Sequence, residues 1–331
     1  MGQTIVVTGG SSGVGLAAAE QLAAQGNEVI IVGRDPERLA NAVARVTTAA
    51  GGREPVWFRC DFDDLAQVRE LADRLLEVCP RIDVLANNAG GMVEGYHCTP
   101  DGFEATIQGN HLAPFLLTNL LRERLRGARV VNTSSRAHQR GRPDPERLAG
   151  DPARYSSWQA YSGAKAANIL FTTEATRRWP DVTSVAFHPG VVRTNFGAGR
   201  ITRFLYRYAP GLVTAEKAGE LLAWLSTAPE AELVNGGYYV GRSPARPWAH
   251  ARDEHLAVRL WAASAEATGL READTDAATP RAADSTATTQ HRTTTDTTGP
   301  RAADDGTAAT PEASTGTTPL PEDDGTISPT T

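Results

Sequence analysis

The chain has 331 residues, which is enough for one large α/β domain or for two smaller ones. It contains 40% hydrophobic residues, no apolar run long enough to span a bilayer and no signal peptide, so we expect a cytoplasmic protein without a membrane span. The formal net charge of −6 comes from residues 275–331, where 9 acids stand against 3 arginines, and the neutral remainder excludes nucleic acid as an expected partner.

Short β-branched runs alternate with helical patterns over the first 270 residues. Strands are predicted at residues 4–8, 28–32, 56–60, 82–86, 129–132, 183–187 and 238–240. Helices are predicted at residues 16–25, from 36 onward, and at 64–78, 99–125, 157–179, 214–227 and 253–267. This alternation predicts an α/β fold with a single Rossmann-like, doubly wound parallel sheet and helices on both faces. Ligands bind such sheets beyond the carboxyl ends of the strands.

The composition changes sharply after this domain, which we place at residues 1–270. Residues 275–331 contain 18 threonines and no aromatic residue, and a Pro-Arg-Ala-Ala-Asp sequence occurs twice in them. Such a segment cannot bury enough apolar surface to offset its ordering entropy, so residues 271–331 are predicted to be a disordered Thr/Ala/Pro-rich acidic tail. A solvated spacer is the simplest role for it, and a docking or phosphoacceptor segment is the alternative.

A glycine-rich turn lies between the first strand and the first helix. Glycines let a backbone turn tightly against a pyrophosphate, and a helix N-terminus offers unpaired N–H groups and a positive dipole end. A tight turn without a ligand is the alternative reading. The residues expected to contact a dinucleotide here are Gly9, Ser11, Ser12, Gly13, Val14 and Gly15.

A tyrosine and a lysine stand four residues apart in Tyr161-Ser162-Gly163-Ala164-Lys165, within a predicted helix. Residues at i and i+4 share one helical face. A nearby ammonium favours the phenolate, which is the tuning that a phenol needs to act as a general acid and base near neutral pH. We therefore expect Tyr161 and Lys165 to be catalytic.

These two motifs resemble those of the short-chain dehydrogenase/reductase family, over about residues 3–243. The Thr-Gly-x-x-x-Gly-x-Gly spacing differs from the G-x-G-x-x-G of most dinucleotide-binding folds. The resemblance implies a nicotinamide-dependent oxidoreductase, in which Tyr161 and Lys165 also contact the cofactor. Family positions map further cofactor contacts onto Asp61 and Phe62 at the adenine, Asn88, Ala89 and Gly90 near the ribose, and Pro189, Gly190, Val192 and Thr194 at the nicotinamide amide.

Cofactor choice is expected to depend on the end of the second strand. An acid there binds the ribose 2′-hydroxyl of NAD and repels a 2′-phosphate. The expected position is Gly33, and Arg34 follows, so the acid is missing and a phosphate-binding guanidinium is present. This pattern predicts NADP(H) over NAD. Asp35 is the competing acid, although Pro36 after it indicates a helix N-cap.

Two more residues complete the catalytic set that the resemblance implies. Ser135, the second serine after the fifth strand, is expected to hold the substrate oxygen. Asn110 is expected to hold a water that links the lysine to solvent. The sequence gives a physical reason for a free acceptor at Asn110. Pro114 has no N–H that could donate to the Asn110 carbonyl, and it tends to kink the helix. His111 is expected to be packed or solvated, and His188 to be structural.

The sequence features that bear on the substrate are less specific than those that indicate the cofactor. Ser135 and Tyr161 are 26 residues apart, with an apparent surface insertion at residues 139–154, and this longer form resembles the branch of retinol dehydrogenases and protochlorophyllide reductase. The aromatic residues of segment 195–211 suggest a lid over an apolar carbonyl or alcohol substrate. Its arginines either face water, as we favour, or bind a carboxylate.

The sequence thus predicts an NADP(H)-dependent oxidoreductase that transfers hydride between NADPH and a ketone, aldehyde or enone, or the corresponding alcohol, with Tyr161 as its general acid and base. A non-catalytic NADP(H)-binding sensor or scaffold of the same fold is the alternative, although it would not need Ser135, Tyr161, Lys165 and Asn110 together. Three widely spaced cysteines fit neither a disulfide framework nor a zinc site, so no metal is expected. Family habit suggests a homo-oligomer, either a dimer or a tetramer.

Overall fold

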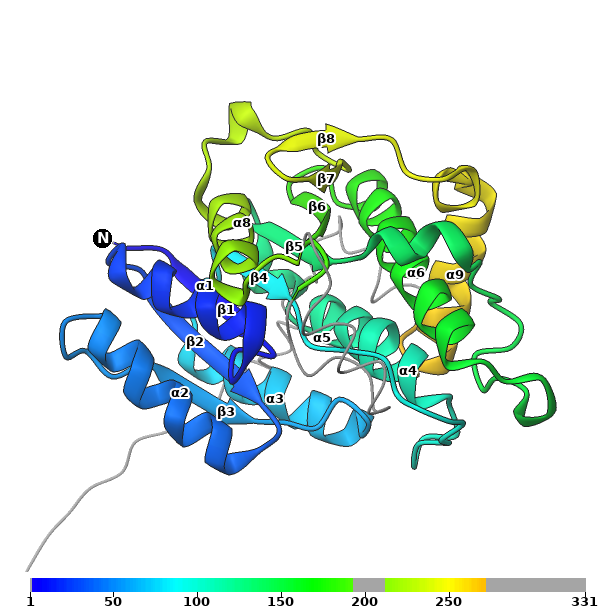
Figure 1. Ribbon diagram of the computed structural model, residues 1–331, viewed down its shortest axis with the longest axis horizontal. Helices are drawn as coiled ribbons and strands as arrows, with labels where there is room; N and C mark the ends of the chain where they lie inside the picture. The colour runs from blue at the N-terminus through cyan, green and yellow to red at the C-terminus, as the bar shows by residue number, and fades with distance from the viewer. Residues whose placement is uncertain (1, 193–211, 272–331) are drawn as a thin grey trace, which may run out of the picture. The chain divides into compact units, whose positions relative to one another are not determined.

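The computed structural model describes residues 2–192 and 212–271, and the predicted lid and tail lie outside these residues. Within the described residues, eight strands form one sheet in the order β3-β2-β1-β4-β5-β6-β7-β8 (Figure 1). The strands are β1 (Thr4–Thr8), β2 (Glu28–Gly33), β3 (Val56–Arg59), β4 (Val84–Asn87), β5 (Arg129–Thr133), β6 (Thr183–His188), β7 (Tyr238–Val240) and β8 (Ser243–Ala245). The order reverses between β1 and β4, so the carboxyl ends of β1 and β4 flank the crevice where such sheets bind ligands.

One strand departs from the predicted all-parallel sheet. The first seven strands are parallel, as expected, but β8 pairs antiparallel with β7. A tight turn that includes Gly241, at φ +61°, joins the two strands. The sequence of β8 is Ser-Pro-Ala, which has no β-branched residue, and its proline is tolerated because β8 is the edge of the sheet.

Helices cover both faces of the sheet. They are α1 (Gly13–Ala24), α2 (Pro36–Ala49), α3 (Leu65–Val78), α4 (Ala105–Ile107), α5 (Ala113–Leu120), α6 (Ser157–Arg178), α8 (Ala215–Thr227) and α9 (Glu254–Ala267). Alternate residues of β1 point to opposite faces. Ile5 and Val7 pack with α1, α2 and α8, whereas Val6 packs with α3, α5, α6 and α9.

The segment predicted as one helix over residues 99–125 is broken in the structure. Thr99 begins a turn that contains Gly102 at φ +86°, and α4 starts only after Glu104, whose carboxylate caps the N–H groups of Thr106 and Ile107 at 2.9 Å. A π-helical turn, Gln108–Leu112, then leads into α5. The prediction of a continuous helix from Thr99 was therefore wrong, because the backbone at Gly102 has a left-handed conformation that a right-handed helix cannot include.

Other predicted helix starts are confirmed. Asp35 lies at the N-cap of α2, where its carboxylate accepts a 2.9 Å hydrogen bond from the Arg38 N–H. Asp64, Thr214 and Asp253 cap α3, α8 and α9 in the same way. The Asp35 carboxylate is therefore engaged in capping α2. Arg34 is the charged residue that directly follows β2.

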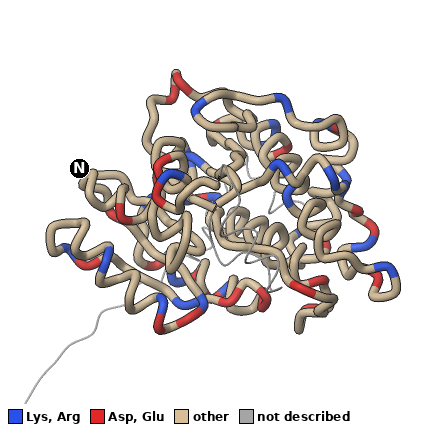
Figure 2. Tube along the Cα trace, viewed as in Figure 1, with Lys and Arg blue, Asp and Glu red and all other residues tan. Residues whose placement is uncertain are grey.

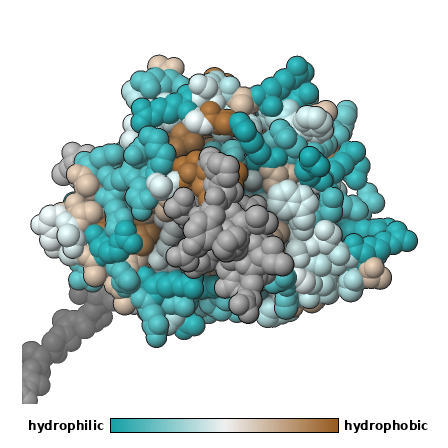
Figure 3. Space-filling view, viewed as in Figure 1, coloured by the Kyte–Doolittle hydropathy of each residue, from teal (hydrophilic) through white to brown (hydrophobic). Residues whose placement is uncertain are grey.

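Charged and apolar residues are mixed over the described part of the molecule. Acidic and basic residues intersperse along the trace (Figure 2), and most of the face in Figure 3 is hydrophilic apart from apolar residues gathered near α8. Among the described helices, none has the length and apolar character required to cross a membrane. The cytoplasmic location stays a prediction.

Candidate active site at the carboxyl ends of the central strands

The glycine turn after β1 forms a cradle that side chains would fill. Gly9 and Gly13 have φ values of +66° and +55°, a conformation that favours glycine. A Cβ on Gly15 would lie 2.4 Å from the Gly9 carbonyl oxygen, so the backbone must approach closely here. The Ser12 hydroxyl at the N-cap makes no capping hydrogen bond, which leaves the first N–H groups of α1 without this partner. Such a turn fits a dinucleotide pyrophosphate.

The Asn87-Asn88-Ala89-Gly90 segment after β4 is tied to β1. Thr8 Oγ1 accepts hydrogen bonds of 3.0 Å from the N–H groups of Asn88 and Ala89, and Asn88 Nδ2 donates to the Thr8 carbonyl. Asn87 Nδ2 donates to Asn132 Oδ1 on β5, also at 3.0 Å. These bonds hold the ends of β1 and β4, which flank the crevice, to each other and to the end of β5.

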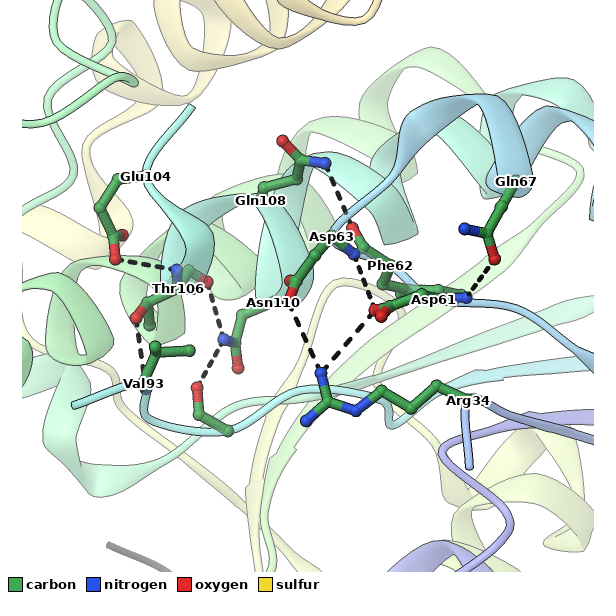
Figure 4. Close-up of polar contacts among 11 residues, drawn as sticks. Arg34, Asp61, Phe62, Asp63, Gln67, Val93, Glu104, Thr106, Gln108 and Asn110 are labelled. Atoms are coloured by element: carbon green, nitrogen blue, oxygen red, sulfur yellow. Dashed lines mark hydrogen bonds and ion pairs between the residues drawn. The ribbon is translucent and has the colours of Figure 1, made fainter. Parts of the chain in front are cut away.

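Arg34, which follows β2, lies close to two carboxylates that follow β3 (Figure 4). Its Nη1 atom is 3.7 Å from Asp61 Oδ1 and 3.5 Å from Asp63 Oδ2, while 68% of its side chain remains exposed. Burial and the neighbouring Asp61 raise the pKa of Asp63, against the opposing effect of Arg34. The sequence analysis missed Asp63, although its position two residues after Asp61 is visible in the sequence. Phe62 is buried in the core, so only its backbone can face a ligand.

Tyr161 and Lys165 lie on one face of α6, as predicted. Lys165 Nζ is 5.5 Å from the centre of the Tyr161 ring. Both side chains are buried, at 8% exposed for the tyrosine and 3% for the lysine. Lys165 Nζ donates a 3.1 Å hydrogen bond to the Thr133 carbonyl oxygen at the end of β5. Burial lowers the pKa of Lys165 to about 7, so a proton can leave or return to this amine near neutral pH.

The two serines after β5 have different environments. Ser134 is buried, and its Oγ donates a 2.7 Å hydrogen bond to the Lys165 carbonyl, which fixes α6 against the strand. Ser135 is partly exposed, and its Oγ accepts a 3.1 Å hydrogen bond from the Ala137 N–H. A hydroxyl that accepts from the backbone still has its own proton to donate. Of the two serines, Ser135 is the one whose hydroxyl is partly exposed, and its role toward a substrate stays a prediction.

Comparisons with known proteins assign the family. A sequence model described as short chain dehydrogenase matches residues 3–202. A Streptomyces protein with the provisional name daunorubicin C-13 ketoreductase is 52% identical over 268 residues, which cover 81% of this chain and 93% of the relative. Human retinol dehydrogenase 13 is 36% identical over 282 residues, covering 81% of this chain and 85% of the relative.

The chain belongs to the short-chain dehydrogenase family.

Solved structures agree with this assignment. A Mycobacterium paratuberculosis protein of unassigned function has a TM-score of 0.68 at 35% identity, covering 81% of this chain and 94% of that one. A Shigella flexneri short-chain dehydrogenase in complex with NADP has a TM-score of 0.54 at 28% identity, covering 68% and 90%. The chain is therefore an oxidoreductase of the short-chain dehydrogenase family and similar to the retinol dehydrogenases, and a nicotinamide dinucleotide is its cofactor class.

In this short-chain dehydrogenase, Asn110 lies in the π-helical turn Gln108–Leu112. Its Nδ2 donates hydrogen bonds of 2.7 Å to the carbonyls of Gly91 and Thr106, while its buried Oδ1 has no hydrogen-bond partner. The π-helical turn ends two residues before Pro114, and π turns often mark functional positions in helices. Gly90 packs against the same side chain, because a Cβ there would lie 2.4 Å from Asn110 Oδ1.

The loop after β6 is described as far as Val192, so the predicted contact at Thr194 lies outside the described residues. Gly190 has φ +95°, and a Cβ on it would lie 2.6 Å from the Val213 side chain. The loop borders a hollow of about 560 Å³ at the ends of β6 and β7. Pro189 and Val192 lie in the same loop, next to the end of the sheet.

The two histidines singled out from the sequence are both packed. His111 is buried with its Nε2 2.9 Å from Ser264 Oγ of α9, and burial lowers its pKa to about 4. His188 Nδ1 accepts a 3.3 Å hydrogen bond from the Arg136 N–H, and burial is the main cause that lowers its pKa to about 4. Both rings are thus neutral at pH 7, and both are packed in the interior. No group of metal-binding side chains occurs among residues 2–192 and 212–271.

Proposed function

We propose that this short-chain dehydrogenase reduces a ketone with NADPH, using Tyr161 as the proton donor. The observation that carries the proposal is the placement of Lys165 Nζ 5.5 Å from the Tyr161 ring, on a helix whose buried face meets the end of β5. The ketoreductase name of the Streptomyces relative supports a ketone as the substrate class.

Four residues of the chain have separate roles in the proposed reduction. Tyr161 gives the proton of its hydroxyl to the carbonyl oxygen as that oxygen gains negative charge. Ser135 donates a hydrogen bond to the same oxygen and stabilises the developing charge. A protonated Lys165 stabilises the phenolate that remains on Tyr161. Asn110 and the π-helical turn hold a water through which the proton of Tyr161 is replaced from solvent.

The cofactor supplies the hydride when it is bound. The glycine turn fits its pyrophosphate, since the closely approached backbone at Gly15 leaves no room for a side chain. Residues that would hold it are Gly9, Ser11, Ser12, Gly13, Val14, Gly15, Arg34, Asp61, Phe62, Asn88, Ala89, Gly90, Tyr161, Lys165, Pro189, Gly190, Val192 and Thr194.

NADPH is preferred in this proposal because Arg34 follows β2 and Asp35 caps α2. The bound NADP of the Shigella flexneri relative supports this choice. The test is the ratio of kcat/KM for NADPH to kcat/KM for NADH, which we expect to exceed one. Arg34→Ala should lower the NADPH value by roughly tenfold or more and change the NADH value little, as expected for the loss of a charge-assisted phosphate contact. A wild-type ratio below one would overturn the preference.

The catalytic part is tested with Tyr161→Phe on a panel of carbonyl compounds. We expect the loss of the proton donor to lower kcat by at least roughly 100-fold, while the Kd for NADPH measured by fluorescence stays within a factor of three. Tight NADPH binding with no turnover of any carbonyl by the wild-type protein would favour the alternative, a sensor or scaffold that does not catalyse.

A further inference from the structure

Three side chains form a stripe along one face of α6 that leads from the interior to the surface. Lys165, Tyr161 and Trp158 are separated by four and three residues, a spacing that puts them on one helical face. Their exposed fractions rise along this stripe from 3% to 8% and then to 42%. The Trp158 and Tyr161 ring centres are 6.2 Å apart, with the ring planes at 39°.

The proton donor has a different neighbour on each side along α6. Toward the C-terminal end, Lys165 is buried and bonded to the end of β5. Toward the N-terminal end, the indole ring of Trp158 lies beside the Tyr161 ring and is 42% exposed. Of these two neighbours, Trp158 is the one that a molecule arriving from solvent can contact.

The start of α6 is held in place by neighbouring chain segments. Ser157 Oγ accepts a 3.0 Å hydrogen bond from the Gly95 N–H, and Tyr155 Oη donates at 2.9 Å to Glu104 Oε1. The Tyr155 ring meets the Tyr96 ring edge to face at 5.5 Å. Trp158 is thus a large apolar ring on a fixed turn, left open to solvent beside the proton donor.

We propose that Trp158 is a stacking platform for a planar aromatic ring system attached to the substrate carbonyl, so that the substrate class is an aryl ketone. This inference rests on the proposed function of the same site. An indole face stacks favourably on another flat π system, whereas a saturated ring of the same size gains only apolar contact. The platform therefore distinguishes flat from puckered substrates.

The experiment compares 2-acetylnaphthalene with its saturated counterpart 2-acetyldecalin, using NADPH and the full chain. Trp158→Ala should lower kcat/KM roughly tenfold for the aryl ketone and less than threefold for the saturated ketone. Trp158→Phe, which keeps a flat ring, should restore most of the aryl activity. Comparing each variant with the wild type cancels the different intrinsic reactivities of the two ketones. Trp57→Ala, a change of a 47% exposed tryptophan on the edge strand β3, is the matched control and should change neither value.

A binding measurement separates this inference from the proposed function. In the NADPH-loaded Tyr161→Phe protein, adding Trp158→Ala should raise the Kd of 2-acetylnaphthalene roughly tenfold. If the wild-type protein reduces neither these ketones nor any carbonyl of the panel but this binding difference is found, the platform stands and the catalytic proposal falls. Equal losses for both ketones, no loss for either, or no binding of the aryl ketone would overturn the platform.

Discussion

Lys165 Nζ donates its hydrogen bond to the carbonyl oxygen of Thr133, which also accepts a 3.0 Å hydrogen bond from Asn168 Nδ2. The Thr133 carbonyl therefore keeps one partner if the lysine is removed. The amine, by contrast, is buried with no carboxylate among the causes that set its pKa. Burial of the Lys165 ammonium therefore lowers the stability of the folded protein. Buried charges of this kind are typical of functional sites.

Lys165→Met should make the protein inactive and more stable. Burial lowers the pKa of Lys165 from 10.5 to about 7, so between these values the unfolded chain binds more protons than the folded chain. The wild-type free energy of unfolding should therefore rise with pH from about 7 toward 10. The methionine variant should lack this rise and, after the loss of one hydrogen bond worth about 1 kcal/mol, be about 3 kcal/mol more stable at pH 7 in urea unfolding. A variant that is less stable at pH 7, or that keeps the slope, would contradict the assignment.

Ser134→Ala and Ser135→Ala should separate stability from activity. Ser134 Oγ makes a buried hydrogen bond to the Lys165 carbonyl, so its loss should cost about 1–2 kcal/mol of unfolding free energy. The alanine at 135 removes a partly exposed cap bond to the Ala137 N–H, so it should cost only about 0.5 kcal/mol or slightly more, but it should lower kcat by roughly 100-fold. Thermal unfolding and steady-state kinetics on both variants provide the check. A large loss of kcat in Ser134→Ala together with a large loss of stability in Ser135→Ala would show that the two roles are reversed.

Asp63→Asn should strengthen the preference for NADPH. A carboxylate 3.5 Å from Arg34 opposes a phosphate at the same guanidinium, whereas an amide does not. We expect kcat/KM for NADPH to rise roughly threefold and the value for NADH to stay constant, mainly through KM. Asp73→Asn, at an exposed position on α3, is the control. An unchanged NADPH to NADH ratio would show that Asp63 has no effect on the phosphate.

His111→Gln should make the protein less sensitive to acid. Burial lowers the pKa of His111 to about 4 from 6.5, so the unfolded chain takes up a proton first as the pH falls through this window. Stability is lost between about pH 6.5 and 4, and this residue accounts for about 2 kcal/mol of the loss at pH 5. Urea unfolding at pH 7.5 and pH 5 should show a smaller difference for the variant, and equal differences would refute the assignment.

The sheet and the main motifs could be predicted from the sequence because each rests on a local signal. β-branched runs gave the positions of seven strands, and Asp35 before Pro36 indicated a cap that the structure confirms. Tyr161 and Lys165 were predictable from helical spacing, which does not depend on the rest of the fold.

Features that depend on distant contacts could not be predicted in this way. Strand β8 forms because the chain turns back onto β7, although its own residues have little strand preference. The helix start at Ala105 depends on Glu104, which competes with the Thr99-Pro100 signal. The role of Asp63 appears only when the end of β3 is placed beside Arg34. The open position of Trp158 next to Tyr161 likewise needed the three-dimensional arrangement of α6.

Because the start of α1 lacks a side-chain cap, the stability of this protein should depend on the concentration of its cofactor. Ser12 leaves the amides of the first turn without a side-chain acceptor, so the pyrophosphate of the proposed cofactor would supply hydrogen-bond acceptors to them. Any ligand that binds only the folded chain raises the free energy of unfolding with its concentration. Amide hydrogens at residues 13–15 should exchange more slowly when dinucleotide is added, and a cell rich in the cofactor would hold a longer-lived enzyme.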